Sequence, residues 1–298
     1  MFEDDKGLRE VISRFGLKPG AMLGYGGEAV VFALDEERVL RVLWSGAEPA
    51  LLRARQELVD ELAATGTPFL LPELGTIGEV NGRWYAVERR LLGQPVSEVL
   101  ATLEGRDRDL LIERYMEATA ALGTLHLEPR SYWGEIIGHD AVRAASWRAY
   151  LHKRAASSLG CSGLPLPGDA PERLASALAE GLPEAEEAAF VHLDAFAGNV
   201  LAVGTAITSV IDIGVTSVAG DSRLDPLSAV VYLAAPQITP AATPRDIEVA
   251  TSFLRENGLE DWLLPARDWL AAYWSFAVSD RKLYEWCRTV LKERGAFG

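Results

Sequence analysis

The spacing of apolar residues changes near residues 91–95, and this change divides the chain into two parts. Before it, short β-branched runs alternate with glycine-bearing turns, which is typical of antiparallel strands. After it, apolar residues recur mostly at helical spacing. We therefore predict an α+β fold of two lobes: a small β-rich lobe with one main helix over residues 1–92, and a larger, mostly helical lobe over residues 93–298.

The N-terminal part predicts a glycine turn followed by paired strands. Gly24, Gly26 and Gly27 run directly into a β-branched stretch that ends at residue 33. The dipeptide Asn81-Gly82 favours a tight hairpin turn. The remaining predicted elements are helices over 8–16 and 49–64 and strands over 39–43, 75–80 and 84–89.

The C-terminal part predicts a set of helices interrupted by one group of strands. The helix from 244 has readable ends, because Thr243 can cap its start and Asn257-Gly258 can stop it. The predicted helices cover 107–127, 140–158, 171–180, 244–257 and 260–292, and the predicted strands cover 190–192, 200–203 and 209–213.

This group of strands carries polar residues at a spacing that suits phosphoryl transfer. His192 is followed by Asp194, then by Asn199 and, at the end of the next strand, by Asp212. Phosphoryl transfer needs a carboxylate that orients the acceptor hydroxyl, and hard oxygen ligands that hold Mg²⁺ against the phosphates. We expect Asp194 to be the catalytic base, and Asn199 and Asp212 to be the metal ligands.

Nearly the whole chain resembles the aminoglycoside phosphotransferase family, the antibiotic kinases with a bilobal protein-kinase-like fold. The most specific match is the set His192, Asp194, Asn199 and Asp212. The resemblance implies ATP or GTP as phosphoryl donor and a small molecule phosphorylated on a hydroxyl group. The supporting segments are the glycine hairpin, the strand 39–42, the connector 88–93, Leu125-His126, Trp133-Gly134, Ser146-Trp147, and Gly220-Asp221 with Asp225.

The resemblance also implies roles for residues that bind the nucleotide. Gly24, Gly26 and Gly27 match the loop that covers the phosphates, since glycine lets the backbone approach them closely. Arg89 and Leu91 lie in the segment that matches the hinge, whose backbone hydrogen-bonds to the purine. His192 is expected to brace the catalytic loop, and Asp225 to anchor it.

Two positions depart from the protein-kinase pattern. Ala29 stands where the nucleotide loop carries its third glycine, and Arg41 stands where a strand lysine contacts the α- and β-phosphates. Arginine can also hold phosphate, but with a different geometry. For the carboxylate that pairs with Arg41 from the helix, we choose Glu57 over Glu61.

The acidic balance of the chain bears on its partners. With 29 basic and 43 acidic side chains, the formal net charge is −14, which argues against nucleic-acid binding and suits a cationic acceptor.

The two cysteines exclude a disulfide framework, and no apolar stretch approaches the roughly 20 residues of a membrane helix, so we expect a soluble cytoplasmic protein without a membrane partner. The resemblance implies an acceptor between the catalytic loop and the helical lobe, often against acidic side chains, and the candidates by position are Glu135, Asp140, Glu260, Asp261, Asp280 and Glu285.

Several alternatives remain open at the level of sequence. A metabolic kinase acting on choline, homoserine or a related alcohol would share the fold and the donor chemistry. Ala29 and Arg41 would also suit a nucleotide-binding pseudokinase. Among antibiotics, aminoglycosides, macrolides and cationic peptides are all possible acceptors. The sequence does not choose between ATP and GTP and does not indicate an oligomeric state.

Overall fold

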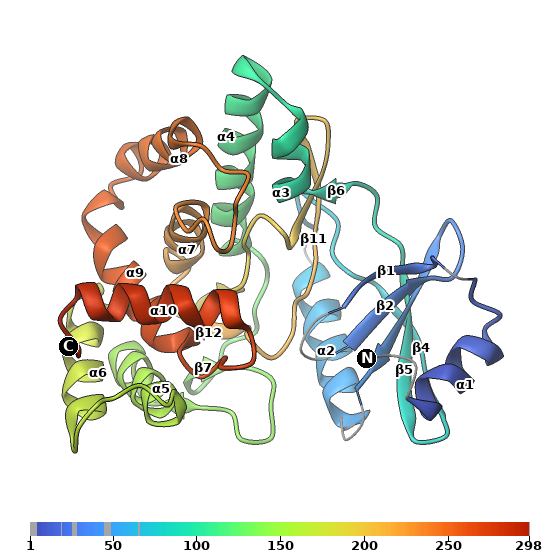
Figure 1. Ribbon diagram of the computed structural model, residues 1–298, viewed down its shortest axis with the longest axis horizontal. Coiled ribbons are helices and arrows are strands. Elements are labelled where there is room, and N and C mark those ends of the chain that lie inside the picture. The colour runs from blue at the N-terminus through green and yellow to red at the C-terminus, as the bar shows by residue number, and fades with distance from the viewer. Residues whose placement is uncertain (1–4, 19, 26–28, 45–48, 65, 298) are drawn as a thin grey trace.

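The computed structural model describes residues 5–18, 20–25, 29–44, 49–64 and 66–297. It confirms the predicted α+β fold, with a β-rich lobe and a larger helical lobe lying side by side (Figure 1). The N-terminal lobe contains a five-stranded antiparallel sheet in the order β1-β2-β3-β5-β4. Its elements are α1 (Lys6–Arg14), β1 (Met22–Tyr25), β2 (Ala29–Ala33), β3 (Arg38–Leu43), α2 (Pro49–Ala63), β4 (Leu74–Val80) and β5 (Arg83–Arg89).

The two faces of this sheet pack against different helices. Side chains alternate along a strand, so each strand contributes to both faces. Leu8 and Val11 of α1 pack with Leu40 and Val42 on one face. On the other face, Leu52 of α2 packs with residues that include Leu43 and Ala86.

Helix α2 also joins the sheet to the helical lobe. Leu58, Val59 and Leu62, in its C-terminal half, belong to the main core of the C-terminal lobe. Accordingly, α2 lies between the sheet and the other lobe, whereas α1 lies on the far side of the sheet (Figure 1). Side chains on the sheet-facing side of α2 are therefore held at the junction of the two lobes.

The predicted tight turn joins β4 to β5. Asn81 and Gly82 both have positive φ angles, of 48° and 78°. These values are those of a type I′ turn, whose twist matches that of antiparallel strands. After β5 ends at Arg89, the chain continues through a short connector into the C-terminal lobe.

The C-terminal lobe consists of helices around two small sheets, ordered β11-β10-β6 and β8-β7-β12-β9. At its centre lies α7 (Leu224–Leu233), in which every residue is buried. The strands are β6 (Gln94–Pro95), β7 (Trp133–Glu135), β8 (Arg143–Ala144), β9 (Ala189–Val191), β10 (Val200–Val203), β11 (Ala206–Val210) and β12 (Val218–Gly220). The other helices are α3 (Val96–Val99), α4 (Gly105–Leu122), α5 (Trp147–Cys161), α6 (Ala170–Glu180), α8 (Pro244–Glu256), α9 (Leu263–Trp274) and α10 (Arg281–Glu293), with 3₁₀ turns at Leu100–Thr102 and Glu260–Trp262.

Two predicted helices differ from the structure. The helix expected over 140–158 begins only at Trp147, because the Ser146 side chain caps it by accepting a hydrogen bond from the Ala149 N–H. The single helix expected over 260–292 is broken between α9 and α10. Asp280 starts the second piece, since its side chain accepts from the N–H groups of Lys282 and Leu283.

A buried ion pair fastens α4 to the start of α8. The Arg108 guanidinium donates to both Asp246 oxygens, at 2.8 and 2.7 Å, and to the Ala241 carbonyl at 2.6 Å. The Asp246 side chain is fully buried and also accepts from the Thr243 N–H in a capping box. A carboxylate placed in this way is stable only with its cation.

Removing this carboxylate should be strongly destabilising. We expect Asp246→Ala to lower the free energy of unfolding by about 3 kcal/mol, because it leaves the Arg108 charge without its partner. Arg245→Ala, which breaks an exposed pair with Asp109 on the same two helices, should cost less than about 1 kcal/mol. Urea denaturation measures both, and equal losses would contradict the assignment.

In the part of the chain that the structure describes, no helix combines the length and the apolar character needed to cross a membrane.

Candidate active site

The loop between β9 and β10 brings two of the predicted site residues together. The Asn199 side-chain Nδ2 donates to the Asp194 carbonyl oxygen at 2.9 Å and to the Asp194 carboxylate at 3.3 Å. The Asn199 N–H closes a turn on the Phe196 carbonyl at 2.8 Å. Since its amide nitrogen is engaged with Asp194, the amide oxygen of Asn199 remains as the atom suited to a metal ion.

Asp212 lies next to this pair, at the point where the chain leaves β11. The Ile211 N–H donates to the Asn199 carbonyl at 2.9 Å, and Asp212 then takes a positive φ of 64°. Its side chain is 46% exposed, and its Oδ1 lies 3.3 Å from Nη1 of Arg41. Desolvation by the protein atoms around it opposes ionisation, but the charges of Arg41 and Arg55 hold the pKa of the Asp212 carboxyl below its ordinary value.

His192 braces the loop between β9 and β10, as the sequence predicted, and links it to Ile211 at the end of β11. Its ring is buried, with Nε2 2.9 Å from the Ile211 carbonyl and Nδ1 3.3 Å from the Asp194 N–H. Burial lowers the pKa of His192, so the neutral ring is favoured. The carbonyl requires a proton on Nε2 and the N–H requires a bare Nδ1, which together assign one tautomer.

Asp225 anchors the start of the loop between β9 and β10, and the sequence predicted this anchoring role. Its two carboxylate oxygens accept from the N–H groups of His192 and Leu193, each at 2.9 Å. Leu193 has a φ of 63°, a strained value for a non-glycine residue that must be held by its surroundings. The hydroxyl of Tyr232 donates to the Leu193 carbonyl and that of Tyr115 to the Ala195 carbonyl, at 2.9 and 2.8 Å.

The buried Asp225 should make stability depend on pH. Desolvation raises the pKa of its carboxyl to about 7, although the two N–H groups favour the charged form. The folded state therefore keeps, between roughly pH 4 and pH 7, a proton that the unfolded chain releases. The contribution of Asp225 to stability is full below about pH 4 and is lost as the pH rises through 7.

We expect the Asp225→Asn variant to lack this dependence. The difference in unfolding free energy between wild type and variant should shrink as pH rises from 5 to 8, by on the order of 1 kcal/mol per pH unit near neutrality. Urea denaturation at pH 5, 6, 7 and 8 measures it. A difference that stays constant or grows over this range would contradict the assignment.

Arg41 binds a carboxylate other than the one predicted. Its Nε donates to Oε1 of Glu88 on β5 at 2.8 Å, and Nη1 of Arg55 on α2 lies 3.7 Å from the same oxygen. The Glu57 side chain is exposed instead, so the structure does not place it in the predicted pair. Glu61 lies elsewhere as well, 2.6 Å from Nη2 of Arg130.

The proposed nucleotide-binding residues are only partly described. Gly24 lies in β1, whereas Gly26 and Gly27 fall outside the described residues. At the end of β5, Arg89 is exposed and lies 3.5 Å from Glu73, and Leu91 in the connector that follows is half-buried. The roles of these residues toward a nucleotide therefore remain predictions.

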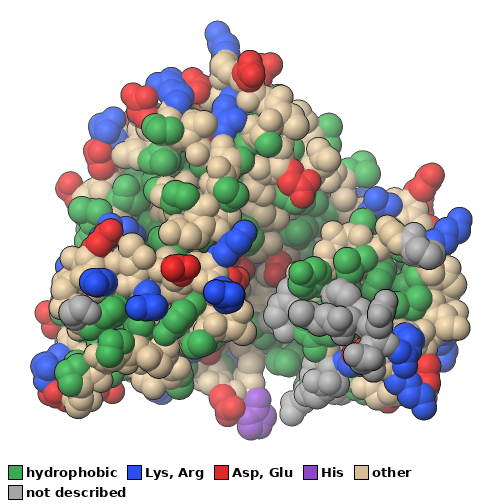
Figure 2. All heavy atoms as spheres, in the orientation of Figure 1, with side chains coloured by type: hydrophobic (Ala, Val, Ile, Leu, Met, Phe, Trp, Pro, Cys, Tyr) green, Lys and Arg blue, Asp and Glu red, His purple; other side chains and the backbone are tan. Residues whose placement is uncertain are grey.

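On the acceptor side, the surface is hollowed between the two lobes (Figure 2). Three of the acidic candidates are engaged in the protein itself. Glu135 is buried, which raises its pKa, and it binds Arg154 and the Val142 N–H. Asp280 caps α10, and Glu260 pairs with Arg255 at 2.8 Å.

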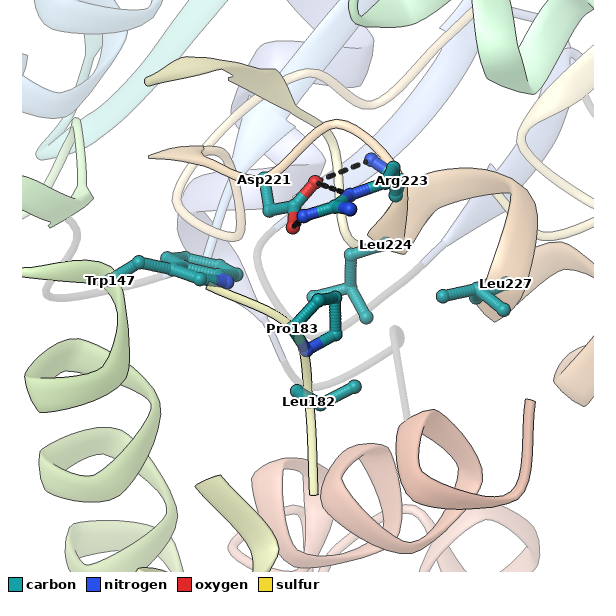
Figure 3. A pocket seen from close by; sticks show the side chains of 7 residues that line it. All are labelled: Trp147, Leu182, Pro183, Asp221, Arg223, Leu224 and Leu227. Carbon is teal, nitrogen blue, oxygen red and sulfur yellow. Dashed lines mark hydrogen bonds and ion pairs between the residues drawn. The ribbon is translucent and has the colours of Figure 1, made fainter. Parts of the chain in front are cut away.

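A separate pocket lies beneath the loop that follows β12. Asp221 and Arg223 face each other at its rim and are joined by hydrogen bonds of 2.6–3.1 Å (Figure 3). Because these two groups bind each other and the other lining residues are apolar, the pocket offers little for a polar acceptor. It is lined by Trp147, Leu182, Pro183, Asp221, Arg223, Leu224 and Leu227.

The donor set at Asn199 and Asp212 fits magnesium. Within the described ranges, no three or more His, Cys, Asp and Glu side chains form a metal cluster. Mg²⁺ does not require such a cluster, because it keeps several waters and binds through one or two protein oxygens together with substrate phosphates. One amide oxygen and one carboxylate, set on adjacent strand ends, meet this requirement.

Comparison with known proteins indicates the family and the fold of the chain. A family model described as the phosphotransferase enzyme family (APH) matches residues 24–273. No curated protein sequence matches the chain. Similar solved structures include an aminoglycoside phosphotransferase APH(4)-Ia mutant with AMP-PNP and hygromycin B (20% identity, 97% of each chain, TM-score 0.68) and APH(2″)-IIa with streptomycin and ATP (13%, 97% and 96%, 0.64).

A third similar structure is APH(3″)-Id from Streptomyces rimosus with ADP and streptomycin, at 14% identity over 88% of this chain and 96% of that one, with a TM-score of 0.56. At these identities the structures show a shared fold. The family model covers most of the chain and includes Asp194, Asn199 and Asp212. The chain therefore belongs to the phosphotransferase enzyme family, as its resemblance to aminoglycoside phosphotransferases indicated.

Proposed function

We propose that the chain is an ATP- or GTP-dependent, Mg²⁺-dependent kinase that phosphorylates a hydroxyl group of an antibiotic. Membership of the family makes it a phosphotransferase with an alcohol acceptor. The observation that carries the finer proposal is the contact of Asn199 with Asp194 on a loop fixed by Asp225, with Asp212 on the neighbouring strand end.

In this proposal Asp194 orients the acceptor hydroxyl and takes its proton. Its side chain is half-buried, and Asn199 donates to its Oδ2 at 3.3 Å, which restricts its orientation. Catalysis by such enzymes is mainly positioning and charge stabilisation, so a fixed carboxylate is the important element. The bonds from Asp225 and Tyr232 keep the preceding backbone in its strained conformation.

Further residues would bind the nucleotide that donates the phosphoryl group, and its metal ion. Asn199 Oδ1 and Asp212 would hold Mg²⁺, which would supply neutralisation of the phosphate charge. Arg41, whose side chain reaches Asp212 across the lobe junction, would contact the phosphates. Gly24, Gly26 and Gly27 would cover them, and the backbone at Arg89 and Leu91 would bind the purine. Similar structures bind AMP-PNP, ATP or GDP, which supports a nucleotide donor.

For the acceptor, we propose a cationic antibiotic. The net charge of −14 favours a cation, and similar structures bind hygromycin B, streptomycin or gentamicin. Of the acidic candidates, Glu135, Glu260 and Asp280 already bind groups of the protein itself, whereas Asp140, Asp261 and Glu285 are exposed.

The test is an ADP-release assay with ATP or GTP over a panel of acceptors: aminoglycosides, macrolides, cationic peptides, choline and homoserine. The proposal expects Mg²⁺-dependent ADP or GDP release with a cationic antibiotic. Turnover only with choline or homoserine would indicate a metabolic kinase. Nucleotide binding without turnover on any acceptor would indicate a pseudokinase.

A further inference from the structure

Four charged side chains alternate in sign across the junction of the two lobes. Arg55 lies 3.7 Å from Glu88, Glu88 lies 2.8 Å from Arg41, and Arg41 lies 3.3 Å from Asp212. Three of these side chains are buried: 6% of the surface of Arg55, 5% of that of Glu88 and 12% of that of Arg41 is exposed. The protein thus holds two arginines around a single buried carboxylate.

The alternation of side chains along the strands brings these groups together. In β3, Arg41 points to the same face as Leu43, and in β5, Glu88 points to the same face as Ala86. Arg41 pairs directly with Ala86, so Glu88 is its diagonal neighbour, within reach of a long side chain. Arg55 follows Leu52 by three residues on α2 and therefore faces the same side of the sheet.

The position of Arg55 matters because Arg41 has two tasks. It binds Glu88 in the structure, and in the proposed function it also contacts the phosphates. When a buried carboxylate loses its only cationic partner, the folded protein is strongly destabilised. If Arg41 alone compensated Glu88, turning Arg41 toward a nucleotide would leave that carboxylate uncompensated.

We propose that Arg55 is a positioning residue of the nucleotide site: it compensates Glu88, so that Arg41 can turn from Glu88 to the phosphates of a nucleoside di- or triphosphate. The inference rests on the proposed function. It also explains why this site has an arginine, rather than the predicted carboxylate, on the helix side of Arg41.

The experiment measures ADP binding by calorimetry in the presence of Mg²⁺. We expect Arg55→Gln to weaken ADP binding about tenfold, because Arg41 then remains held by Glu88. Arg53→Gln is the matched control: it removes the same charge from the exposed side of the same helix and should bind ADP like the wild type. Unchanged ADP binding by Arg55→Gln would overturn the inference.

A double variant separates positioning from a general loss of structure. Arg55→Gln/Glu88→Gln should recover ADP affinity to within about twofold of Glu88→Gln alone, because without the carboxylate there is nothing for Arg55 to compensate. A double variant that stays tenfold weaker than Glu88→Gln would overturn the inference. This comparison holds even where Arg55→Gln alone does not fold. If the wild type binds neither ADP nor GDP, the proposed function itself fails.

Discussion

Asp194→Ala should lower kcat by about three orders of magnitude, since a positioned general base contributes roughly 10²- to 10⁴-fold. ADP affinity should stay within about twofold of the wild type, because the substitution keeps the backbone carbonyl that binds Asn199 at 2.9 Å. The measurements are steady-state kinetics with a responsive acceptor and calorimetry with ADP.

Asp107→Ala is the matched control for this variant. Its carboxylate is exposed in the first turn of α4 and lies in the same lobe, so its removal should leave kcat within about twofold of the wild type. An Asp194→Ala enzyme with normal kcat would show that another group serves as the base. A variant that loses ADP binding as well would show that Asp194 belongs to the nucleotide site.

Asp212→Ala should remove the effect of Mg²⁺ on nucleotide binding. For the wild type, we expect EDTA to weaken ADP binding by at least about tenfold, because Asp212 would hold a metal ion that neutralises the charge of the phosphates. The variant should bind ADP equally weakly with Mg²⁺ and with EDTA, and its kcat should fall by two or more orders of magnitude.

Asp221→Ala provides the comparison for Asp212→Ala. Asp221 is a carboxylate of the same lobe that pairs with Arg223 beside the separate pocket, whose lining includes neither Asn199 nor Asp212. Its variant should retain the Mg²⁺ effect even if it loses stability. A clear gain in ADP affinity from Mg²⁺ in Asp212→Ala would exclude Asp212 as the metal ligand.

The helices, strands and turns that are determined by neighbouring residues were predicted from the sequence. The turn at Asn81-Gly82, the capped helix at Thr243 and the strand at 200–203 follow from neighbouring residues, and the structure contains each of them. The strands β7 and β12 were missed, because each has only three residues and they pair with each other and with β8 and β9, which lie elsewhere in the sequence. The buried helix α7 was missed because its apolar residues surround it and leave no amphipathic pattern.

The site was predictable where its residues are close in sequence. Asp194 and Asn199 share one loop, so their spacing already places them together. The partner of Arg41 was not predictable in this way. Glu57 and Arg55 lie two residues apart on α2 and therefore on different sides of the helix, and only packing against the sheet decides which of them faces Arg41. The diagonal neighbour Glu88 depends on strand register, which sequence patterns do not fix.

In the proposed mechanism, Asn199 and Asp212 would hold a divalent metal ion between the two strand ends. Crystals of the enzyme grown with AMP-PNP and Mn²⁺ in place of Mg²⁺ would locate that ion by its anomalous scattering. We predict an anomalous peak in contact with Asn199 Oδ1, the Asp212 carboxylate and the nucleotide phosphates, with the Asp194 carboxylate facing the γ-phosphate. A bound nucleotide whose metal ion contacts neither Asn199 nor Asp212 would contradict it.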